Sequence, residues 1–212
     1  MPRRFTEQEE HRIICDLRQA ARDIMGRRGV RKTAIDELAG AAGISKGSFY
    51  RFYDSKESLA LEVLAEWERS FHDGITRRFS REKPYGLQEC ARQLTAVFLE
   101  DFPQQLMLSG LQGLFDPQEI AWLIQRAGQE EVQRMEEQDI RLLGRLKPLL
   151  AAGGLQPVQG DQVIVAGLRM LFEGGSGSLR QPSPQYSTAF GLLVKGFLMQ
   201  MFRLSGKEGM DE

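Results

Sequence analysis

Apolar residues recur every three or four positions through most of the chain, which is the period of an amphipathic α-helix. The first apolar stripe follows a capping box, in which the Thr6 hydroxyl accepts a free N–H and Glu9 reaches back to residue 6. We expect this helix to end near Gly29, where the stripe stops. Its apolar positions are Ile13, Leu17, Ala20 or Ala21, and Ile24.

Two short helices and one longer helix are predicted next. A capping signal at residues 33–36 opens the first of them, and Gly43 breaks it. Ser45 is a favourable N-cap for the second, from Lys46 to about Tyr53. Residues 54–57 cap the third, whose apolar stripe consists of Leu59, Val63, Leu64, Trp67 and Phe71.

Residues 81–86 form a break, and helical patterns resume beyond it over 87–101, 103–114, 117–150, 161–173 and 186–204. No strand-like alternation of useful length occurs. The predicted fold class is therefore all-α, with about nine helices. We expect an N-terminal domain of three helices, residues 1–56, and a larger C-terminal helical domain, residues 57–212.

The helix-turn-helix interpretation depends on the two short helices joined by residues 42–45. Gly43 lets the chain turn at little steric cost, and Ile44 can seal the angle between the helices. The second helix of such a pair enters the major groove of DNA. A helix that begins after Ser45 would place Lys46, Gly47 and Ser48 at its groove-facing tip, with Tyr50 and Arg51 about one turn later.

Charge is distributed unevenly along the chain. Residues 1–56 carry 12 Lys and Arg against 8 Asp and Glu, a formal charge of +4. Residues 57–212 carry 16 against 21, a formal charge of −5. A basic head on an acidic body favours a polyanionic partner for the head.

The stretch TAIDELAGAAGISKGSFYRFYDSKESL, residues 33–59, closely resembles the DNA-binding signature of the tetracycline-repressor (TetR) family of transcriptional regulators. The resemblance covers 27 positions, and the rest of the chain is similar to that family in length and helical pattern alone. The stretch departs from the family pattern at Phe52, where His or another polar aromatic is usual, and at Tyr53, where Phe is usual. Phe52 cannot donate a hydrogen bond to a phosphate.

The resemblance implies a role for individual residues in DNA binding. Thr33 is expected to touch a phosphate, and Tyr50 and Lys56 are expected to anchor the DNA backbone. The residues expected to face the groove are Lys46, Gly47, Ser48 and Arg51.

The last two predicted helices are apolar on more sides than one small body can cover. Either they are core helices of a monomer, or a second copy of the chain covers one face, as in the TetR family and as twofold operators require. We expect a homodimer. Its candidate interface residues are Leu168, Leu171, Phe172, Phe190, Val194, Phe197 and Met201.

Aromatic and methionine side chains are concentrated in the middle of the chain, where a TetR-like protein would hold a small-molecule inducer. Each of them taken separately is better explained as a core residue. The candidate ligand residues are Phe98, Phe102, Met107, Phe115, Trp122, Met135 and Asp139. Asp139 is the polar exception on its helix and either contacts a ligand or pairs with a nearby arginine.

The remaining chemistry argues against catalysis and against a metal site. No glycine-rich phosphate loop, nucleophile elbow or metal-ligand cluster is present, so no enzyme activity, cofactor or metal is expected. Cys15 and Cys90 are predicted to be packing thiols, and His11 and His72 ordinary surface histidines. Without a signal-peptide or membrane-spanning pattern, the expected location is the cytoplasm.

The sequence therefore predicts an N-terminal helix-turn-helix DNA-binding domain, residues 1–56, and a C-terminal helical ligand-binding and dimerisation domain, residues 57–212. The expected function is that of a dimeric DNA-binding repressor that a largely apolar ligand releases from its operator. Two alternatives remain open at this point: a DNA-binding dimer without an inducer, and a helical protein-interaction module.

Overall fold

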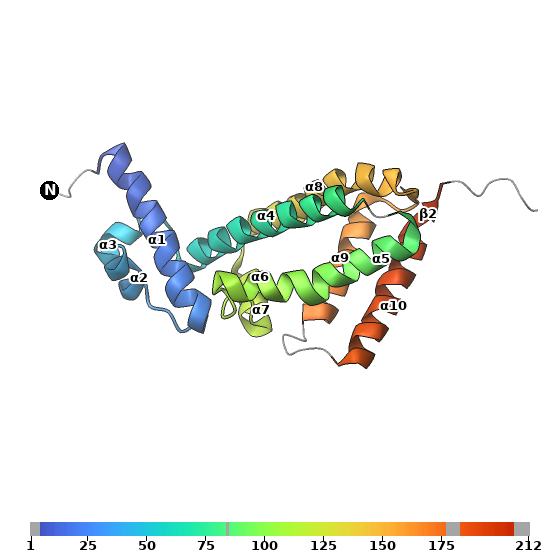
Figure 1. Cartoon of the computed structure of the whole chain (residues 1–212). Helices are drawn as coiled ribbons and strands as arrows, with labels where there is room; N and C mark the ends of the chain where they lie inside the picture. Colours follow the sequence, from blue (N-terminus) through green and yellow to red (C-terminus); the bar gives the residue numbers. More distant parts are fainter. Residues whose placement is uncertain (1–4, 84, 177–182, 206–212) are drawn as a thin grey trace, which may run out of the picture. The chain divides into compact units, whose positions relative to one another are not determined.

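The computed structural model describes residues 5–83, 85–176 and 183–205, and Figure 1 shows their predominantly helical path. The all-α fold class is confirmed, with one small pair of strands added to it. In chain order the elements are α1 (Glu7–Arg28), α2 (Ile35–Ala41), α3 (Lys46–Phe49), α4 (Lys56–Glu82), α5 (Gly86–Ala96), the π-helical η1 (Val97–Asp101), α6 (Phe102–Ser109), α7 (Pro117–Arg126), α8 (Gln129–Ala152), β1 (Leu155–Pro157), α9 (Asp161–Ser176), α10 (Pro184–Met201) and β2 (Phe202–Leu204).

The chain divides into two compact units. The first unit contains residues 1–68 and 106–133, and the second contains residues 69–105 and 134–212. Helices α4, α6 and α8 each contribute residues to both units. The predicted boundary between a DNA-binding domain, residues 1–56, and a ligand-binding and dimerisation domain, residues 57–212, stays a prediction. It falls directly after Lys56, the first residue of α4.

Helix α1 begins and ends as its sequence predicts. The Thr6 side chain accepts the N–H of Glu9 at 3.3 Å, and the Glu9 carboxylate accepts the N–H of Thr6 at 2.9 Å, which completes the capping box. Gly29 ends the helix with a positive φ of 84°, a conformation that a side chain would disfavour. The buried face of α1 carries Leu17, Ala21 and Met25.

Ion pairs join the polar edge of α1 to the first part of α4. Arg18 pairs with both Glu62 and Glu66, and Arg22 also pairs with Glu66. The Arg18 Nη1 to Glu66 Oε1 distance is 2.9 Å. These partly buried pairs connect the two helices beside the apolar contacts that Leu59 and Val63 make from the buried face of α4.

Residues 106–133 belong to the first unit because their backbone lies directly against the end of α1. The N–H of Gly113 donates to the carbonyl of Gly26 at 2.6 Å. A Cβ at Gly26 would lie 2.3 Å from the carbonyl oxygen of Gly110, and a Cβ at Gly113 would lie 2.7 Å from that of Gly26. Only glycine allows two backbone segments to approach this closely.

The predicted helix over 117–150 is interrupted, which corrects the sequence-based interpretation. Helix α7 ends at Arg126 and α8 begins at Gln129, with Ala127 in an extended conformation between them. Helix α3 is also shorter than predicted, because it ends at Phe49 and the next residues form a turn.

Strands β1 and β2 were not predicted. They pair antiparallel, with Leu155 opposite Leu204 and Pro157 opposite Phe202. Each strand has three residues, which is too short for an alternating pattern to be recognised in the sequence. The pair joins the end of α10 to the segment that follows α8.

The core of the second unit is aromatic. Phe102 meets Phe172 edge-on with ring centroids 4.6 Å apart, and Phe98 meets Phe190 edge-on at 5.8 Å. Helix α10 packs along α5, and α9 contacts both α10 and η1. The wide π-helical turn η1 ends two residues before Pro103, which has no N–H to donate to a regular helix.

Candidate nucleic-acid interface

Helices α2 and α3 pack against each other and form the predicted helix-turn-helix. Gly43 has a φ of 68°, and the N–H of Ile44 donates to the carbonyl of Ala39 at 2.9 Å, which closes the turn. Ser45 caps α3 by accepting the N–H of Ser48 at 3.2 Å. Leu38 and Phe49 are fully buried beneath the two helices. The turn residues therefore act as the sequence predicts.

The structure brings five of the seven predicted DNA-binding residues together on α3 and the turn that follows it. Lys46, Gly47, Tyr50 and Arg51 are exposed, and Ser48 is half-buried. The nearest atom to a Cβ built at Gly47 is the Ser45 hydroxyl oxygen at 3.9 Å. Residue 47 therefore leaves a bare backbone on this surface, where a duplex could approach closely.

Carboxylates already hold the two cations of this surface. The Lys46 Nζ donates to Asp36 Oδ2 at 2.9 Å, and this hydrogen bond raises the pKa of Lys46. The Arg51 Nη2 lies 3.4 Å from Glu10 Oε1, and its guanidinium lies 4.8 Å from the centre of the Phe5 ring. Phosphate binding by Lys46 or Arg51 must compete with these intramolecular partners.

Thr33 and Lys56, the other two predicted DNA contacts, have partners inside the protein. The Thr33 side chain is only 2% exposed, and its hydroxyl donates to the carbonyl of Gly29 at 2.8 Å. The Lys56 Nζ donates to the carbonyls of Val30 and Thr33, each at 2.8 Å, and to that of Arg31 at 3.3 Å. Lys56 therefore organises the loop between α1 and α2, and phosphate contacts by these two residues stay predictions.

Glu119 is a contributor to the same loop that the sequence analysis missed. Its side chain is buried at the start of α7, where its carboxylate accepts the N–H groups of Val30 and Arg31 at 2.9 and 3.2 Å. The Arg31 Nε donates to the other carboxylate oxygen at 2.5 Å. Burial raises the pKa of Glu119, but the hydrogen bonds from Arg31 and Val30 outweigh it and lower the pKa below its ordinary value.

The predicted ligand residues are divided between the two units. Met107, Phe115 and Trp122 belong to the first unit, and Phe98, Phe102, Met135 and Asp139 belong to the second. Met107 is 70% exposed. Phe115 packs edge-on against Trp67 with centroids 4.6 Å apart, and the Arg126 guanidinium lies 4.2 Å from the centre of the Trp122 ring.

Within the second unit, Phe98 and Phe102 are buried in the aromatic core, and Met135 is half-buried. Asp139 pairs with an arginine, one of the two alternatives that the sequence left open. Its Oδ2 accepts the Arg169 Nε at 2.6 Å, and Arg169 Nη2 is buried without a hydrogen-bond partner. Phe98 and Phe102 therefore lie in the aromatic core of the second unit, and Asp139 lies in an ion pair with Arg169.

The expected surface position of His72 is wrong. The residue is buried, and its Nε2 lies 3.6 Å from Asp139 Oδ1. Burial lowers the pKa of His72, and the nearby Asp139 opposes that shift. Cys15 is exposed, whereas Cys90 is the packing thiol that was expected, with its pKa raised to about 11 by burial.

The structure divides the predicted dimer residues between the chain's own core and its surface. Phe190 and Val194 are buried in the second unit, where α10 packs on α5, and Phe197 packs against the backbone at Gly167. Leu168, Leu171, Phe172 and Met201 are half-buried. The apolar side chains that remain exposed on α9 and α10 are Val163, Met170, Leu192, Leu193 and Met199.

Among residues 5–83, 85–176 and 183–205, no cluster of three or more His, Cys, Asp or Glu side chains is arranged to hold a metal ion. In the same ranges, no helix combines the length and the apolar character needed to cross a membrane.

Comparison with known proteins identifies the N-terminal segment. Residues 17–63 match the family model of bacterial regulatory proteins, tetR family. A curated relative, the HTH-type transcriptional repressor KstR2 of Rhodococcus jostii (strain RHA1), is 36% identical over 76 residues, which cover 36% of this chain and 35% of the relative. The match thus spans about a third of the length of that relative.

Solved structures share the fold of a larger part of the chain. RolR in complex with resorcinol is similar with a TM-score of 0.55 and 18% identity, over 92% of this chain and 90% of RolR. FadR from Bacillus subtilis in complex with stearoyl-CoA is similar with a TM-score of 0.54 and 13% identity, over 87% of this chain and 96% of FadR. At these identities the likeness shows the fold alone. Taken with the family match, the capped helix-turn-helix identifies residues 17–63 as a TetR-family segment, and the resemblance seen in the motif is confirmed.

Proposed function

We propose that the protein is a dimeric, non-enzymatic transcriptional repressor that binds operator DNA through α2 and α3. The observation that carries this proposal is the exposed surface formed by Lys46, Gly47, Tyr50 and Arg51 beside a capped helix-turn-helix. The match of the surrounding segment to the tetR family model supports the same conclusion. The curated relative in that segment is named as a transcriptional repressor.

The chemistry of this surface suits a phosphate backbone and base edges. Lys46 and Arg51 exchange their carboxylate partners for DNA phosphates or acceptor atoms of bases, and Tyr50 adds a hydroxyl donor. Gly47 allows the backbone to come close to the duplex. The +4 charge of residues 1–56 favours the encounter with DNA.

Fluorescence anisotropy with duplex fragments from beside the protein's own gene tests DNA binding. The wild-type chain is expected to bind one of these fragments with an affinity that falls steeply as the salt concentration rises. Arg51→Ala is expected to weaken binding and to change the preferred sequence. Arg141→Ala removes an equal charge from an exposed arginine of α8 and serves as the control. If no fragment binds in a salt-dependent manner, the proposal is wrong.

The dimer forms, in this proposal, through the exposed apolar faces of α9 and α10. Leu192 and Leu193 are each more than 60% exposed, and Met170 and Met199 are exposed as well. A second copy would remove this apolar area from water, and a twofold dimer matches two half-sites on DNA. Leu193→Glu should dissociate the dimer without unfolding the chain, because the side chain is exposed within one chain.

Sedimentation velocity at micromolar concentration tests the dimer. The wild-type protein is expected to sediment with twice the mass of the 24.0 kDa chain. Leu108→Glu makes the same substitution at an exposed leucine of α6 and should leave the dimer intact. A wild-type monomer, or equal dissociation by both variants, would contradict this part of the proposal.

A small, largely apolar ligand that weakens DNA binding is the remaining part of the proposal. RolR and FadR, which share the fold, were solved with resorcinol and with stearoyl-CoA. The described residues that favour such a site are Phe98 and Phe102 in the aromatic core of the second unit, and the ion pair between Asp139 and Arg169 in the same unit. The alternative is a DNA-binding dimer without an inducer.

A screen of apolar compounds distinguishes these two possibilities when it records both ligand binding and operator affinity. A compound that binds must lower operator affinity by the same factor by which the operator lowers affinity for the compound. Phe102→Ala should lower the affinity for the compound. When the compound is absent, the same variant should bind the operator as the wild type does. If no compound both binds and alters operator affinity, the dimer without an inducer is the better description.

A further inference from the structure

A shallow, open basic cleft lies on the second unit. It has a volume of about 560 Å³ and is lined by residues of α4 and α8: Asp73, Thr76, Arg77, Ser80, Arg81 and Arg145. Three arginines and one aspartate give this lining a formal charge of +2, although residues 57–212 as a whole are acidic. The cleft therefore has the opposite sign to the unit that contains it.

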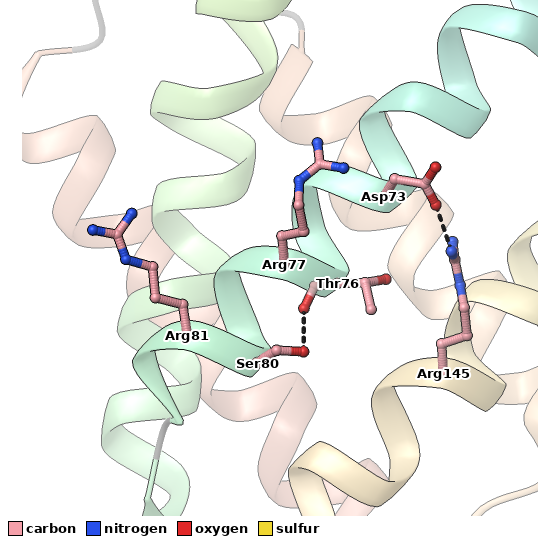
Figure 2. Close-up of a pocket in the computed structure, with 6 residues that line it drawn as sticks. All are labelled: Asp73, Thr76, Arg77, Ser80, Arg81 and Arg145. Carbon is pink, nitrogen blue, oxygen red and sulfur yellow. Dashed lines mark hydrogen bonds and ion pairs between the residues drawn. The ribbon is translucent and has the colours of Figure 1, made fainter.

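Arg145 is held in position from the side of α4. Its Nη1 lies 2.5 Å from Asp73 Oδ1, and this hydrogen bond lowers the pKa of Asp73. Figure 2 shows Asp73 between the guanidinium groups of Arg77 and Arg145. The single carboxylate of the cleft is thus committed to Arg145, whose other N–H groups remain available as donors.

Within residues 5–83, 85–176 and 183–205, neither Arg77 nor Arg81 forms a hydrogen-bonded ion pair with a carboxylate, although the charge of Arg77 also helps to lower the pKa of Asp73. They lie one turn apart on α4, a spacing at which two like charges repel. Glu82, the acidic residue next in the chain, instead pairs with Arg78 and Arg92 at 3.6 and 3.5 Å. The repulsion between the two arginines would be relieved by an anion bound between them.

The hydroxyl groups of the cleft do not take part as donors. Thr76 donates to the carbonyl of His72 at 2.9 Å, and Ser80 donates to that of Thr76 at 2.8 Å, as the dashed line in Figure 2 marks. The guanidinium groups therefore supply the hydrogen bonds for a ligand. The favourable end of the helix dipole accounts for a cation such as Arg81 in the last turn of α4, but it does not account for Arg145 on another helix.

We propose that this cleft binds the phosphate or diphosphate group of a small molecule. Each guanidinium can donate two parallel N–H bonds to an oxyanion, so Arg77 and Arg81, one turn apart on α4, offer four such donors and two positive charges. A group with two or more charges and at least three terminal oxygens matches this donor set. This proposal does not depend on the proposed function.

Isothermal titration calorimetry with sodium pyrophosphate, and separately with inorganic phosphate, tests the cleft at matched ionic strength. The full chain is expected to bind pyrophosphate saturably, with one site per chain and more tightly than inorganic phosphate. Arg77→Gln and Arg81→Gln are each expected to lower the affinity for pyrophosphate at least about tenfold. Arg77→Lys keeps the positive charge and loses the planar guanidinium group. Its affinity for pyrophosphate should therefore lie between those of the wild type and Arg77→Gln.

Arg141→Gln is the matched control, because it removes one charge from an exposed arginine of the same unit outside the cleft. It should change pyrophosphate affinity by less than about twofold. Circular dichroism should show all these variants folded, since the arginines are exposed. The proposal is overturned if the wild type gives no saturable binding or if Arg141→Gln weakens it equally. It is also overturned if Arg77→Gln lowers the affinity for a non-operator duplex and leaves the affinity for pyrophosphate unchanged.

Discussion

The carboxylate of Glu119 accepts the backbone N–H of Val30 at 2.9 Å, although the two residues are 89 positions apart. Val30 belongs to the loop that leads from α1 into the helix-turn-helix, and Glu119 lies in the first turn of α7. Lys56, the first residue of α4, donates hydrogen bonds to carbonyl groups of the same loop. A buried anion thus binds the donors of this loop and a cation binds its acceptors, so that most of its backbone polarity is satisfied.

Glu119→Gln is expected to destabilise the fold, because a neutral amide replaces an anion that accepts three N–H groups. The loss should be about 2–3 kcal/mol, the contribution of hydrogen bonds to a buried charged group. Thermal unfolding followed by circular dichroism measures it. Glu100→Gln, at an exposed carboxylate of η1, should have little effect. Equal melting temperatures for wild type and Glu119→Gln would contradict this role.

The stabilisation by Glu119 should depend on pH. Its pKa in the folded chain lies below the ordinary value of a glutamate because of the hydrogen bonds from Arg31 and Val30, so the folded state holds the ionised form more tightly than the unfolded chain does. The contribution is therefore complete above about pH 5 and is lost as the pH falls through the folded pKa. Denaturant titrations at a series of pH values give the free energy of unfolding of the wild type and of Glu119→Gln. The difference between the two free energies should stay constant near neutral pH and shrink as the pH falls. A difference that stays constant down to pH 3 would count against this linkage.

Lys56→Ala is expected to weaken DNA binding through the shape of the loop and without the loss of a phosphate contact. The substitution leaves the carbonyls of Val30, Arg31 and Thr33 without their shared donor. Affinity should fall while the slope of log affinity against log salt concentration stays unchanged, whereas loss of a phosphate contact lowers that slope by about one unit. Lys32→Ala, at an exposed lysine of the same loop, is the comparison. A slope reduced by one unit in Lys56→Ala would restore the phosphate role that the family resemblance implied.

Local features of the helix-turn-helix could be predicted from the sequence because each depends on a few neighbouring residues. The capping box at Thr6, the N-cap at Ser45 and the turn at Gly43 all form where they were expected. Each side chain that caps or turns the chain acts on backbone groups within about four positions. The surface of Lys46 and Arg51 follows from these local decisions.

Features that depend on distant segments could not be predicted in the same way. Whether Phe190 and Val194 face a partner or the core depends on α5, which packs along α10 from about 100 residues earlier. The pairing of β1 with β2 and the burial of Glu119 are likewise long-range. Periodicity identifies an apolar face, but it does not name the element that covers that face.

Asp36→Asn is expected to strengthen DNA binding with little dependence on sequence. Asp36 holds the Lys46 ammonium at 2.9 Å on the exposed surface of α2 and α3, where it competes with DNA phosphates. Removing the carboxylate should raise affinity about two- to fivefold, in line with the small effect of an exposed ion pair. Anisotropy titrations with operator and with unrelated duplex measure the change. Asp16→Asn, which frees the exposed Arg12 on α1, is the control, and weaker binding by Asp36→Asn would contradict the competition.

Gly26→Ala should destabilise the contact between α1 and residues 110–113, whereas Gly144→Ala should stabilise the chain. A methyl group at residue 26 would lie 2.3 Å from the carbonyl oxygen of Gly110. Because that oxygen belongs to the backbone, the clash cannot be relieved by the rotation of a side chain. The expected cost is about 1–3 kcal/mol, as for an overpacked core position. At Gly144, within α8, nothing lies within 4 Å of the added methyl, so the reduced entropy of the unfolded chain should raise stability by about 0.5–1 kcal/mol. Chemical denaturation of the two variants beside the wild type measures both signs. A Gly26→Ala protein as stable as the wild type would mean that residues 110–113 do not lie against α1 at this distance in solution.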